Sequence, residues 1–292
     1  MVMFLGSGAD PTFRHTVTAL AKRGIDGDII DLGHLVLAGD FTLPLDGTPG
    51  TVQLAGETFH LTAPMVTRLI DISSAAPSKE LAERARATQT SIARYLRTLP
   101  WEHVVGAPWD NSNFSKIFQL SLAGGRSWTI PETLVTNNPD AAREFARRHD
   151  VVYKGASSSK TWANVFQPTD AARLALLARA PALFQERVIG FDVRVHVVGN
   201  QVFGEAVHTD SCDYRISQNA TFNAITVPPE VKADCVDLTR AMKLVLSGID
   251  FKVTGDEEWF FLEANSSPCF QGYDRRAEGA ISDALAEHLR TI

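Results

Sequence analysis

Short apolar runs alternate with helical patterns along the first hundred residues. The runs predict strands at Val2–Leu5, Asp28–Leu32 and Val66–Ile70. Apolar positions at helical spacing predict helices at Thr12–Arg23 and Lys79–Leu99. Strands that alternate with helices indicate an α/β unit with a largely parallel sheet.

Two features interrupt this alternation. The stretch Phe41–His60 is rich in Thr, Gly and Pro, and it predicts a hairpin-like insertion. The polar run Trp109–Asn113 predicts a domain boundary near residue 110. Beyond it, helices are predicted at Ser115–Ala123, from Asn138 onwards, and at Asp170–Ala180, Val231–Leu246 and Asp274–Leu289. Strands are predicted at Glu132–Val135, Val151–Lys154, Trp162–Phe166, Phe184–Val188, Asp192–Val198, Gln201–Thr209, Gly248–Val253 and Trp259–Asn265. From Ala182 onwards the pattern is rich in strands.

The last two strands predict a pair of facing carboxylates. If they form a hairpin centred between Asp256 and Glu257, Asp250 lies opposite Glu263. Asn265 then shares their face, while the opposite, core face holds Ile249, Phe251, Val253, Phe260, Leu262 and Ala264. Facing carboxylates repel unless a cation lies between them, and Mg²⁺ prefers such oxygen ligands. The alternative is a solvated face whose charges point to water.

A second hairpin is predicted around the two-residue turn Gly199-Asn200. Its register places Arg194 opposite Glu205 and His196 opposite Phe203. One interpretation is a plain cross-strand ion pair. The other is that Arg194 stabilises phosphate charge in a transition state while Glu205 holds its guanidinium in place.

Two loops of small residues partly match phosphate-binding motifs. Gly6-Ser7-Gly8 lacks the third glycine of a dinucleotide fingerprint, and an ordinary turn is the better interpretation. In Gly155–Thr161, Ser159 replaces the glycine that precedes the lysine of a P-loop. Backbone amides there, together with Lys154 and Lys160, are still suited to cradle phosphates. The alternative is that these lysines face water.

Composition excludes several classes of protein. The 292 residues include 28 Lys and Arg and 34 Asp and Glu, so the net charge is −6, which disfavours a nucleic-acid partner. No apolar run approaches the roughly 18 residues of a membrane span, and the start reads as a strand, not a signal peptide. The cysteines Cys212, Cys235 and Cys269 are too scattered for a disulfide framework or a structural zinc site. A cytoplasmic protein without nucleic-acid or membrane partners is expected.

Taken in order, a series of segments resembles the ATP-grasp ligases, and among them the RimK-like carboxylate–amine ligases and the peptide-maturing branch. The segments run from about residue 111 to residue 273. They are Asn113–Lys116, Ile130–Asn137, Val152–Lys154, Gln185–Val188, Gly190–Arg194, Asp213–Arg215, Gly248–Asp250 and Phe261–Pro268. Their shared order, more than any single segment, carries the resemblance.

The resemblance implies an ATP-grasp fold, in which two α+β lobes clasp ATP behind an α/β N-terminal domain. The expected division is 1–110 for the N-terminal domain, 111–184 for the central lobe and 185–292 for the C-terminal lobe. The implied cofactors are ATP and Mg²⁺, with Mn²⁺ as a substitute. The metal would be held by Asp250, Glu263 and Asn265.

The same resemblance implies roles around the nucleotide. Phosphates would contact Lys116, Lys154 and Lys160, the last of which stands where many relatives carry Arg. Adenine would meet Gln185, Glu186 and Val188, and the ribose hydroxyls would meet Glu186 or Asp192. Arg194 and Arg215 would face the γ-phosphate and the acyl phosphate formed from it.

Two residues outside these segments were considered. Arg68 is suited to bind a substrate carboxylate, although a surface or salt-bridged arginine is the favoured interpretation. Cys269 stands in the loop that would border the acceptor site, where a reactive thiol is one interpretation and a small buried apolar residue is the favoured one.

The function implied is ATP-dependent activation of a carboxylate as an acyl phosphate, followed by amide formation with an amino acid or peptide amine. A precursor-peptide maturase that forms side-chain ester or amide links is the first alternative. A kinase of the same fold and a nucleotide-binding module without catalysis are the others. The expected partner is an amino acid or peptide, and a homo-oligomer is left open because relatives form dimers and tetramers.

Overall fold

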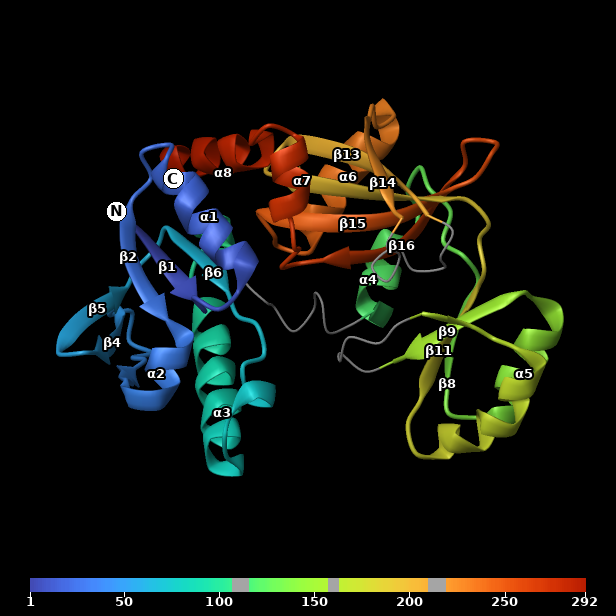
Figure 1. The fold of residues 1–292 in the computed structure, drawn as a ribbon, viewed down its shortest axis with the longest axis horizontal. Helices are drawn as coiled ribbons and strands as arrows, with labels where there is room; N and C mark the ends of the chain where they lie inside the picture. Colours follow the sequence, from blue (N-terminus) through green and yellow to red (C-terminus); the bar gives the residue numbers. More distant parts are fainter. Residues whose placement is uncertain (107–115, 157–162, 210–218) are drawn as a thin grey trace.

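The computed structural model describes residues 1–106, 116–156, 163–209 and 219–292. Figure 1 shows three bodies along the chain, each built around its own sheet. The predicted boundary near residue 110 lies outside the described residues. None of the helices in the described part is long and apolar enough to cross a membrane.

The first body holds a parallel sheet, as predicted. Its strand order is β2-β1-β6-β7, and each neighbouring pair runs parallel. The strands are β1 (Val2–Gly6), β2 (Gly27–Asp31), β6 (Met65–Arg68) and β7 (Val104–Val105). Helices α1 (Pro11–Ala21) and α3 (Lys79–Leu96) correspond to the two predicted helices. Asp10 caps α1 by accepting from the Phe13 amide at 2.7 Å.

The region after β2 differs from its prediction in two ways. Helix α2 (Leu32–Ala38), capped by Asp31, begins where the strand was expected to end. The predicted hairpin is a three-stranded antiparallel sheet of β3 (Asp40–Thr42), β4 (Gly50–Leu54) and β5 (Glu57–Leu61). The 3₁₀ turns Ser73–Ala75 and Trp101–His103 complete this body.

The second body is an antiparallel sheet with one covered face. Its order is β10-β9-β11-β8, from β8 (Thr133–Thr136), β9 (Val151–Gly155), β10 (Asn164–Val165) and β11 (Ala182–Glu186). Helix α5 (Pro139–Arg148), capped by Asn138, packs on it together with the segment Pro168–Ala178. That segment corresponds to the helix predicted at Asp170–Ala180, and it is of the tighter 3₁₀ type.

The third body is a five-stranded antiparallel sheet in the order β14-β13-β12-β15-β16. Its strands are β12 (Phe191–Val198), β13 (Gln201–His208), β14 (Thr221–Ile225), β15 (Leu246–Val253) and β16 (Trp259–Asn265). Helices α4 (Lys116–Ala123) and α6 (Pro229–Ala241) pack against it. Strand β14 was not predicted.

The carboxylate hairpin keeps its predicted register only in one half. Asp250 pairs with Glu263, but a β-bulge follows and Phe251 pairs with Phe261. Leu262 is the extra residue of the bulge. Phe261 is therefore the fully buried residue of this part of β16, and the predicted core positions Phe260 and Leu262 are only partly buried.

Two predicted helices are interrupted by left-handed residues. Helix α6 stops at Ala241, and Lys243 follows with φ +55°, so Leu246 opens β15 instead of ending the helix. The closing helix is split into α7 (Gln271–Arg276) and α8 (Ala280–Thr291). Gly279, with φ +90°, separates the two.

The first and third bodies share an interface with a buried apolar core, in which Phe13 and Leu20 of α1 belong to one cluster with Leu285 of α8, and with polar contacts beside it. Helix α1 lies beside α8 in Figure 1, and Arg23 on the α1 side pairs with Asp283 at 2.6 Å. His15 bonds to the buried Asp274 of α7 at 2.7 Å. These contacts hold α7 and α8 against the α1 side of the first body.

Candidate functional site

The carboxylates predicted to face one another lie on the adjacent strands β15 and β16, at one edge of the third sheet. Asp250 of β15 is directly opposite Glu263 of β16, and Asn265 is opposite Gly248. The Asn265 amide nitrogen donates to Asp250 Oδ2 at 3.2 Å. The three residues therefore form one cluster on one face of the sheet.

Two lysines converge on Glu263 from different parts of the chain. Lys116, at the start of α4, places its Nζ 2.8 Å from Glu263 Oε2. Lys154, on β9 of the second body, places its Nζ 3.6 Å from the same oxygen. Lys154 therefore connects the second sheet to the carboxylates of the third.

Burial lowers the pKa of Lys154. The positive charge of Lys116 lowers it further, and Glu263 opposes both effects. An ammonium group that is costly to keep charged here gains from any additional anion. The lysine pair is thus suited to a strongly anionic ligand.

Arg194 lies against Asp250 and not against its predicted partner. Its Nε is 2.9 Å from Asp250 Oδ1, and its Nη1 donates to the Gly248 carbonyl at 3.0 Å. Arg194 pairs in register with Glu205, as predicted, but the Glu205 carboxylate binds Arg276 of α7 at 2.6 and 2.7 Å. The predicted Arg194–Glu205 ion pair is therefore wrong, because β15 and α7 each supply a closer partner.

The donor set fits a divalent cation. Asp250 and Glu263 supply carboxylate oxygens, and rotation of the Asn265 amide would turn its oxygen toward them. Within the described residues, no cluster of three His, Cys, Asp or Glu side chains is placed to hold a metal ion. Two carboxylates and one amide match a metal such as Mg²⁺, which takes few protein ligands and completes its shell with phosphates and water.

The candidates for the adenine and ribose site lie on and after β11. Gln185 is buried and its amide donates to the Thr133 hydroxyl at 3.0 Å, while the Glu186 carboxylate accepts from the Glu132 amide at 3.3 Å. Residues 187–190, which include Val188, link the second sheet to the third. Asp192 of β12 pairs with Lys252 at 2.9 Å.

Two candidates lie outside the described residues. Lys160 falls in 157–162 and Arg215 falls in 210–218, so their assignment to phosphate binding stays a prediction. The structure brings together Lys116, Lys154, Arg194, Asp250, Glu263 and Asn265. With three cations and two carboxylates, this cluster carries an excess positive charge that favours phosphate.

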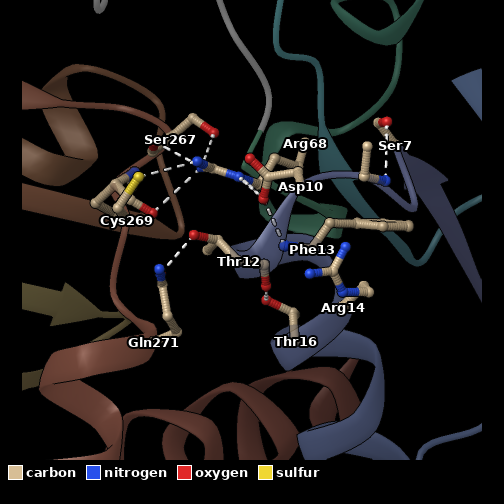
Figure 2. A network of polar contacts seen from close by, with 12 residues as sticks. Ser7, Asp10, Thr12, Phe13, Arg14, Thr16, Arg68, Ser267, Cys269 and Gln271 are labelled. Carbon is tan, nitrogen blue, oxygen red and sulfur yellow. Dashed lines mark hydrogen bonds and ion pairs between the residues drawn. The ribbon is translucent and has the colours of Figure 1, made fainter. Parts of the chain in front are cut away.

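Arg68 fastens the loop that follows Asn265 to the first body (Figure 2). Its Nε pairs with Asp10 at 2.8 Å, which confirms the salt-bridged interpretation. Its Nη1 donates to the Ser267 carbonyl at 2.9 Å, and its Nη2 lies 3.1 Å from Cys269 Sγ. Cys269 is exposed, so the prediction of a small buried residue is wrong.

Sequence reasoning missed two charged partners of the site. Lys252 faces Asp192, and Arg276 faces Glu205, across element pairs that no local pattern reveals. The Asp192–Lys252 register follows only once β12 and β15 are known to be neighbours. The position of Arg276 depends on how α7 folds back over the sheet.

Comparison with protein families gives a match to the RimK-like ATP-grasp domain over residues 130–289. This match covers more than half of the chain. The chain belongs to the RimK-like ATP-grasp family. The matched region contains the carboxylate pair, Asn265, Lys154 and Arg194, so the family assignment and the geometry refer to the same site.

Solved structures of similar fold extend the match to the N-terminal body. The ATP-grasp ligase PsnB, complexed with a phosphomimetic variant of its minimal precursor, Mg and ADP, has a TM-score of 0.82 and 27% identity. The alignment covers 99% of this chain and 98% of PsnB. The macrocyclase MdnC from Microcystis aeruginosa MRC, bound with precursor peptide MdnA, has a TM-score of 0.81 at 21% identity, with all of both chains covered. A comparison with curated protein sequences gave no match.

Proposed function

We propose that this ATP-grasp ligase modifies a peptide, and that it uses ATP and Mg²⁺ to join a side-chain carboxylate to a hydroxyl or amine of the same peptide. The geometry that carries the proposal is the convergence of Lys154 and Lys116 on Glu263, next to the Asp250–Arg194 pair. PsnB, which is similar along nearly its whole length, was solved with a precursor, Mg and ADP. That similarity favours the precursor-peptide maturase over a ligase for free amino acids.

The first step proposed is phosphoryl transfer. A carboxylate oxygen of the peptide attacks the γ-phosphorus of ATP, the bond to the β-phosphate oxygen breaks, and ADP leaves. Lys116 and Lys154 would hold the phosphates and lower the cost of their charge. Mg²⁺ held by Asp250, Glu263 and Asn265 would neutralise the charge that develops on the phosphate oxygens.

The second step uses the acyl phosphate as an electrophile. A hydroxyl or amine of the peptide attacks its carbonyl carbon, the carbon–phosphate oxygen bond breaks, the proton of the attacking group passes to the departing phosphate, and inorganic phosphate leaves with its negative charge. Arg194, held in place by Asp250 and the Gly248 carbonyl, would stabilise that leaving charge. Each new bond removes one water from the peptide.

The proposal is tested in two stages. The melting temperature is measured with and without MgCl₂ and a non-hydrolysable ATP analogue. A ligand at 100 times its Kd adds about 2.7 kcal/mol, which raises the melting temperature by several degrees. Peptides that carry Thr or Ser beside Asp or Glu are then screened for ADP release and for loss of water by mass spectrometry.

The outcomes separate the alternatives left by the sequence. ADP release together with water loss supports the ligase, and mild base, which cleaves esters but spares amides, identifies the bond. Phosphopeptide without water loss would indicate a kinase. A nucleotide-dependent shift with no peptide-stimulated ADP release would indicate a binding module, and no shift at all would overturn the proposed site.

A further inference from the structure

A cavity of about 270 Å³ lies on the same face of the third sheet as the carboxylate cluster. It is bounded by strands β12, β13 and β14 and by the segment from α7 into α8. His196 at its wall is two positions along β12 from Arg194 and lies on the same face. Two strand residues span roughly 7 Å, so the cavity borders the proposed acyl phosphate site.

The walls of the cavity are largely aromatic. Phe203, Phe222 and Tyr273 line it, and so does Arg276. The Arg276 guanidinium carbon lies 4.0 Å from the Phe222 ring centroid and 4.8 Å from the Tyr273 ring centroid. Phe222 and Tyr273 also contact each other edge to face, and the sides of these rings that line the cavity favour another flat ring packed against them.

Among the described residues, the charged side chains that line the cavity neutralise each other. Its two charged residues, Arg276 and Glu205, pair with each other through two hydrogen bonds of 2.7 and 2.6 Å. Burial, together with the positive charges of Arg194 and Arg276, holds the pKa of His196 well below its usual range. His196 is therefore neutral near pH 7, and a neutral ligand suits the site.

One residue that lines the cavity, His196, has a buried polar atom without a partner among the described residues. His196 is 1% exposed, and no hydrogen-bond partner reaches its Nε2 within the part of the chain that the structure describes. A buried nitrogen without a hydrogen bond is destabilising, and a ligand that supplies one removes that cost. The ligand therefore carries a hydroxyl or a similar neutral polar group at the end that reaches His196.

The volume limits the size of the ligand. Pockets for whole small molecules span roughly 300–1,000 Å³, so 270 Å³ suits one large side chain and not a nucleotide. A tyrosine side chain combines the flat ring, the neutral charge and the terminal hydroxyl that the cavity requires.

We propose that this cavity is a specificity pocket of the enzyme that receives a tyrosine side chain of the peptide substrate, with the phenol hydroxyl hydrogen-bonded to His196 Nε2. The proposal rests on the proposed peptide-ligase function, because it assigns the pocket to the same substrate. It places a tyrosine close to the residue whose carboxylate is activated. The aromatic rings bind the phenol ring, and His196 distinguishes tyrosine from phenylalanine.

The test uses N-acetyl-L-tyrosinamide and N-acetyl-L-phenylalaninamide as probes of the full chain, followed by ligand-observed NMR. Fragments of this size bind in about the millimolar range. We expect the tyrosine probe to bind about three- to tenfold more tightly than the phenylalanine probe, the change expected for one neutral hydrogen bond. Equal binding of the two probes, or no binding of either at about 20 mM, would overturn the proposal.

Filling the pocket provides the matched control. Ala224 lines the cavity and pairs with Glu205, so Ala224→Phe should occupy the space and abolish tyrosine binding. Asn223→Phe, at the exposed neighbouring position on the other face of β14, should leave binding unchanged. Ala277→Phe fills the same cavity from the helical side and serves if Ala224→Phe does not fold. Binding that survives a folded filling variant would contradict the assignment.

The nucleotide site is measured on the same samples. The thermal shift produced by Mg²⁺ and the ATP analogue should be the same in wild type, Ala224→Phe and Asn223→Phe. A normal nucleotide shift without selective tyrosine binding would defeat the pocket alone. Loss of the nucleotide shift in the wild type would instead defeat the proposed function, whatever the probes do.

Discussion

Arg68 donates a hydrogen bond of 2.9 Å to the carbonyl of Ser267, two residues beyond the candidate metal ligand Asn265 (Figure 2). Arg68 lies at the end of β6 in the N-terminal sheet, and Asp10 at the start of α1 fixes the opposite edge of its guanidinium. The first body therefore holds the loop that leaves the carboxylate cluster. This link gives the N-terminal body a role in positioning the site, although it supplies none of the clustered charges.

We expect Arg68→Lys to lower turnover about tenfold while nucleotide affinity stays within about twofold. The substitution removes only the guanidinium hydrogen bonds that hold the loop after Asn265. Lys keeps the charge beside Asp10 but cannot reach Asp10, Ser267 and Cys269 together. Arg14→Lys is the control, because exposed Arg14 donates to the Gly8 carbonyl at the rim of the same network and forms no hydrogen bond or ion pair with Asp10, Ser267 or Cys269 in the described part of the chain. Steady-state ADP release and the nucleotide thermal shift are the measurements; equal loss of both would show a general structural defect.

The Asp10–Arg68 pair also predicts a pH dependence of stability. Burial raises the pKa of Asp10, but hydrogen bonds from Arg68 and the Phe13 amide outweigh it and hold the pKa below its usual 3.8. The pair thus contributes stability fully above about pH 4, and that contribution is lost as the pH falls through the lowered pKa. Asp10→Asn keeps the helix cap but removes the charge.

We expect the melting temperature of Asp10→Asn to lie a few degrees below wild type at pH 7. The difference should shrink as the pH falls below about 4, since wild type then loses the same charge. Scanning calorimetry from pH 3 to pH 8 checks this. A difference that stays constant across that range would show that the charge of Asp10 is irrelevant.

Local pattern was enough to predict the pairing of Asp250 with Glu263 and of Arg194 with Glu205. Strand alternation and turn position are local, so both pairings follow from the chain itself. The bulge at Leu262 was not predictable in this way, because it depends on fitting Phe261 into the core beneath the sheet. The bulge shifts the register by one residue, so the predicted core positions Phe260 and Leu262 give way to Phe261.

The side-chain partners were harder to predict than the register. The sequence predicts Glu205 as the partner of Arg194 because β12 and β13 follow each other in the chain, whereas β15 is distant from both. Strand β15 lies on the other side of β12 and gives Arg194 the partner Asp250. Helix α7 gives Glu205 the partner Arg276. Such contacts come from the tertiary arrangement, and the split of the closing helix at Gly279 decides where Arg276 lies.

Lys154→Ala should weaken nucleotide binding. Its Nζ lies near Glu263 and loses charge stabilisation through burial, so bound phosphate would restore a favourable partner. We expect the analogue-induced thermal shift to fall by more than half, which corresponds to at least a tenfold loss of affinity. Lys232→Ala on the exposed side of α6 is the control and should behave as wild type. An unchanged shift in Lys154→Ala would remove this lysine from the phosphate site.

Glu263→Gln should remove most of the Mg²⁺-dependent turnover. The substitution keeps the size of the side chain but removes the carboxylate charge that both lysines and the metal would share. We expect turnover to fall by about 10²–10³-fold. Glu258→Gln, exposed at the hairpin turn, should retain full activity. A Mg²⁺ titration of ADP release separates the two variants, and a normal titration curve for Glu263→Gln would exclude it as a ligand.

Arg194 provides the sharpest distinction between a structural and a catalytic role. Its guanidinium is buried against Asp250 and the Gly248 carbonyl, so Arg194→Ala leaves a carboxylate without its cation and lowers stability as well as activity. Arg194→Lys keeps the charge but loses the bond geometry. If Arg194 stabilises the leaving phosphate, Arg194→Lys should fold normally, bind the ATP analogue within about threefold of wild type and turn over about 10²-fold more slowly. If it only neutralises Asp250, Arg194→Lys should restore turnover to near wild type. Single-turnover ADP release measured beside product formation also locates the defect, because slowed product with normal ADP release places Arg194 at the acyl phosphate step.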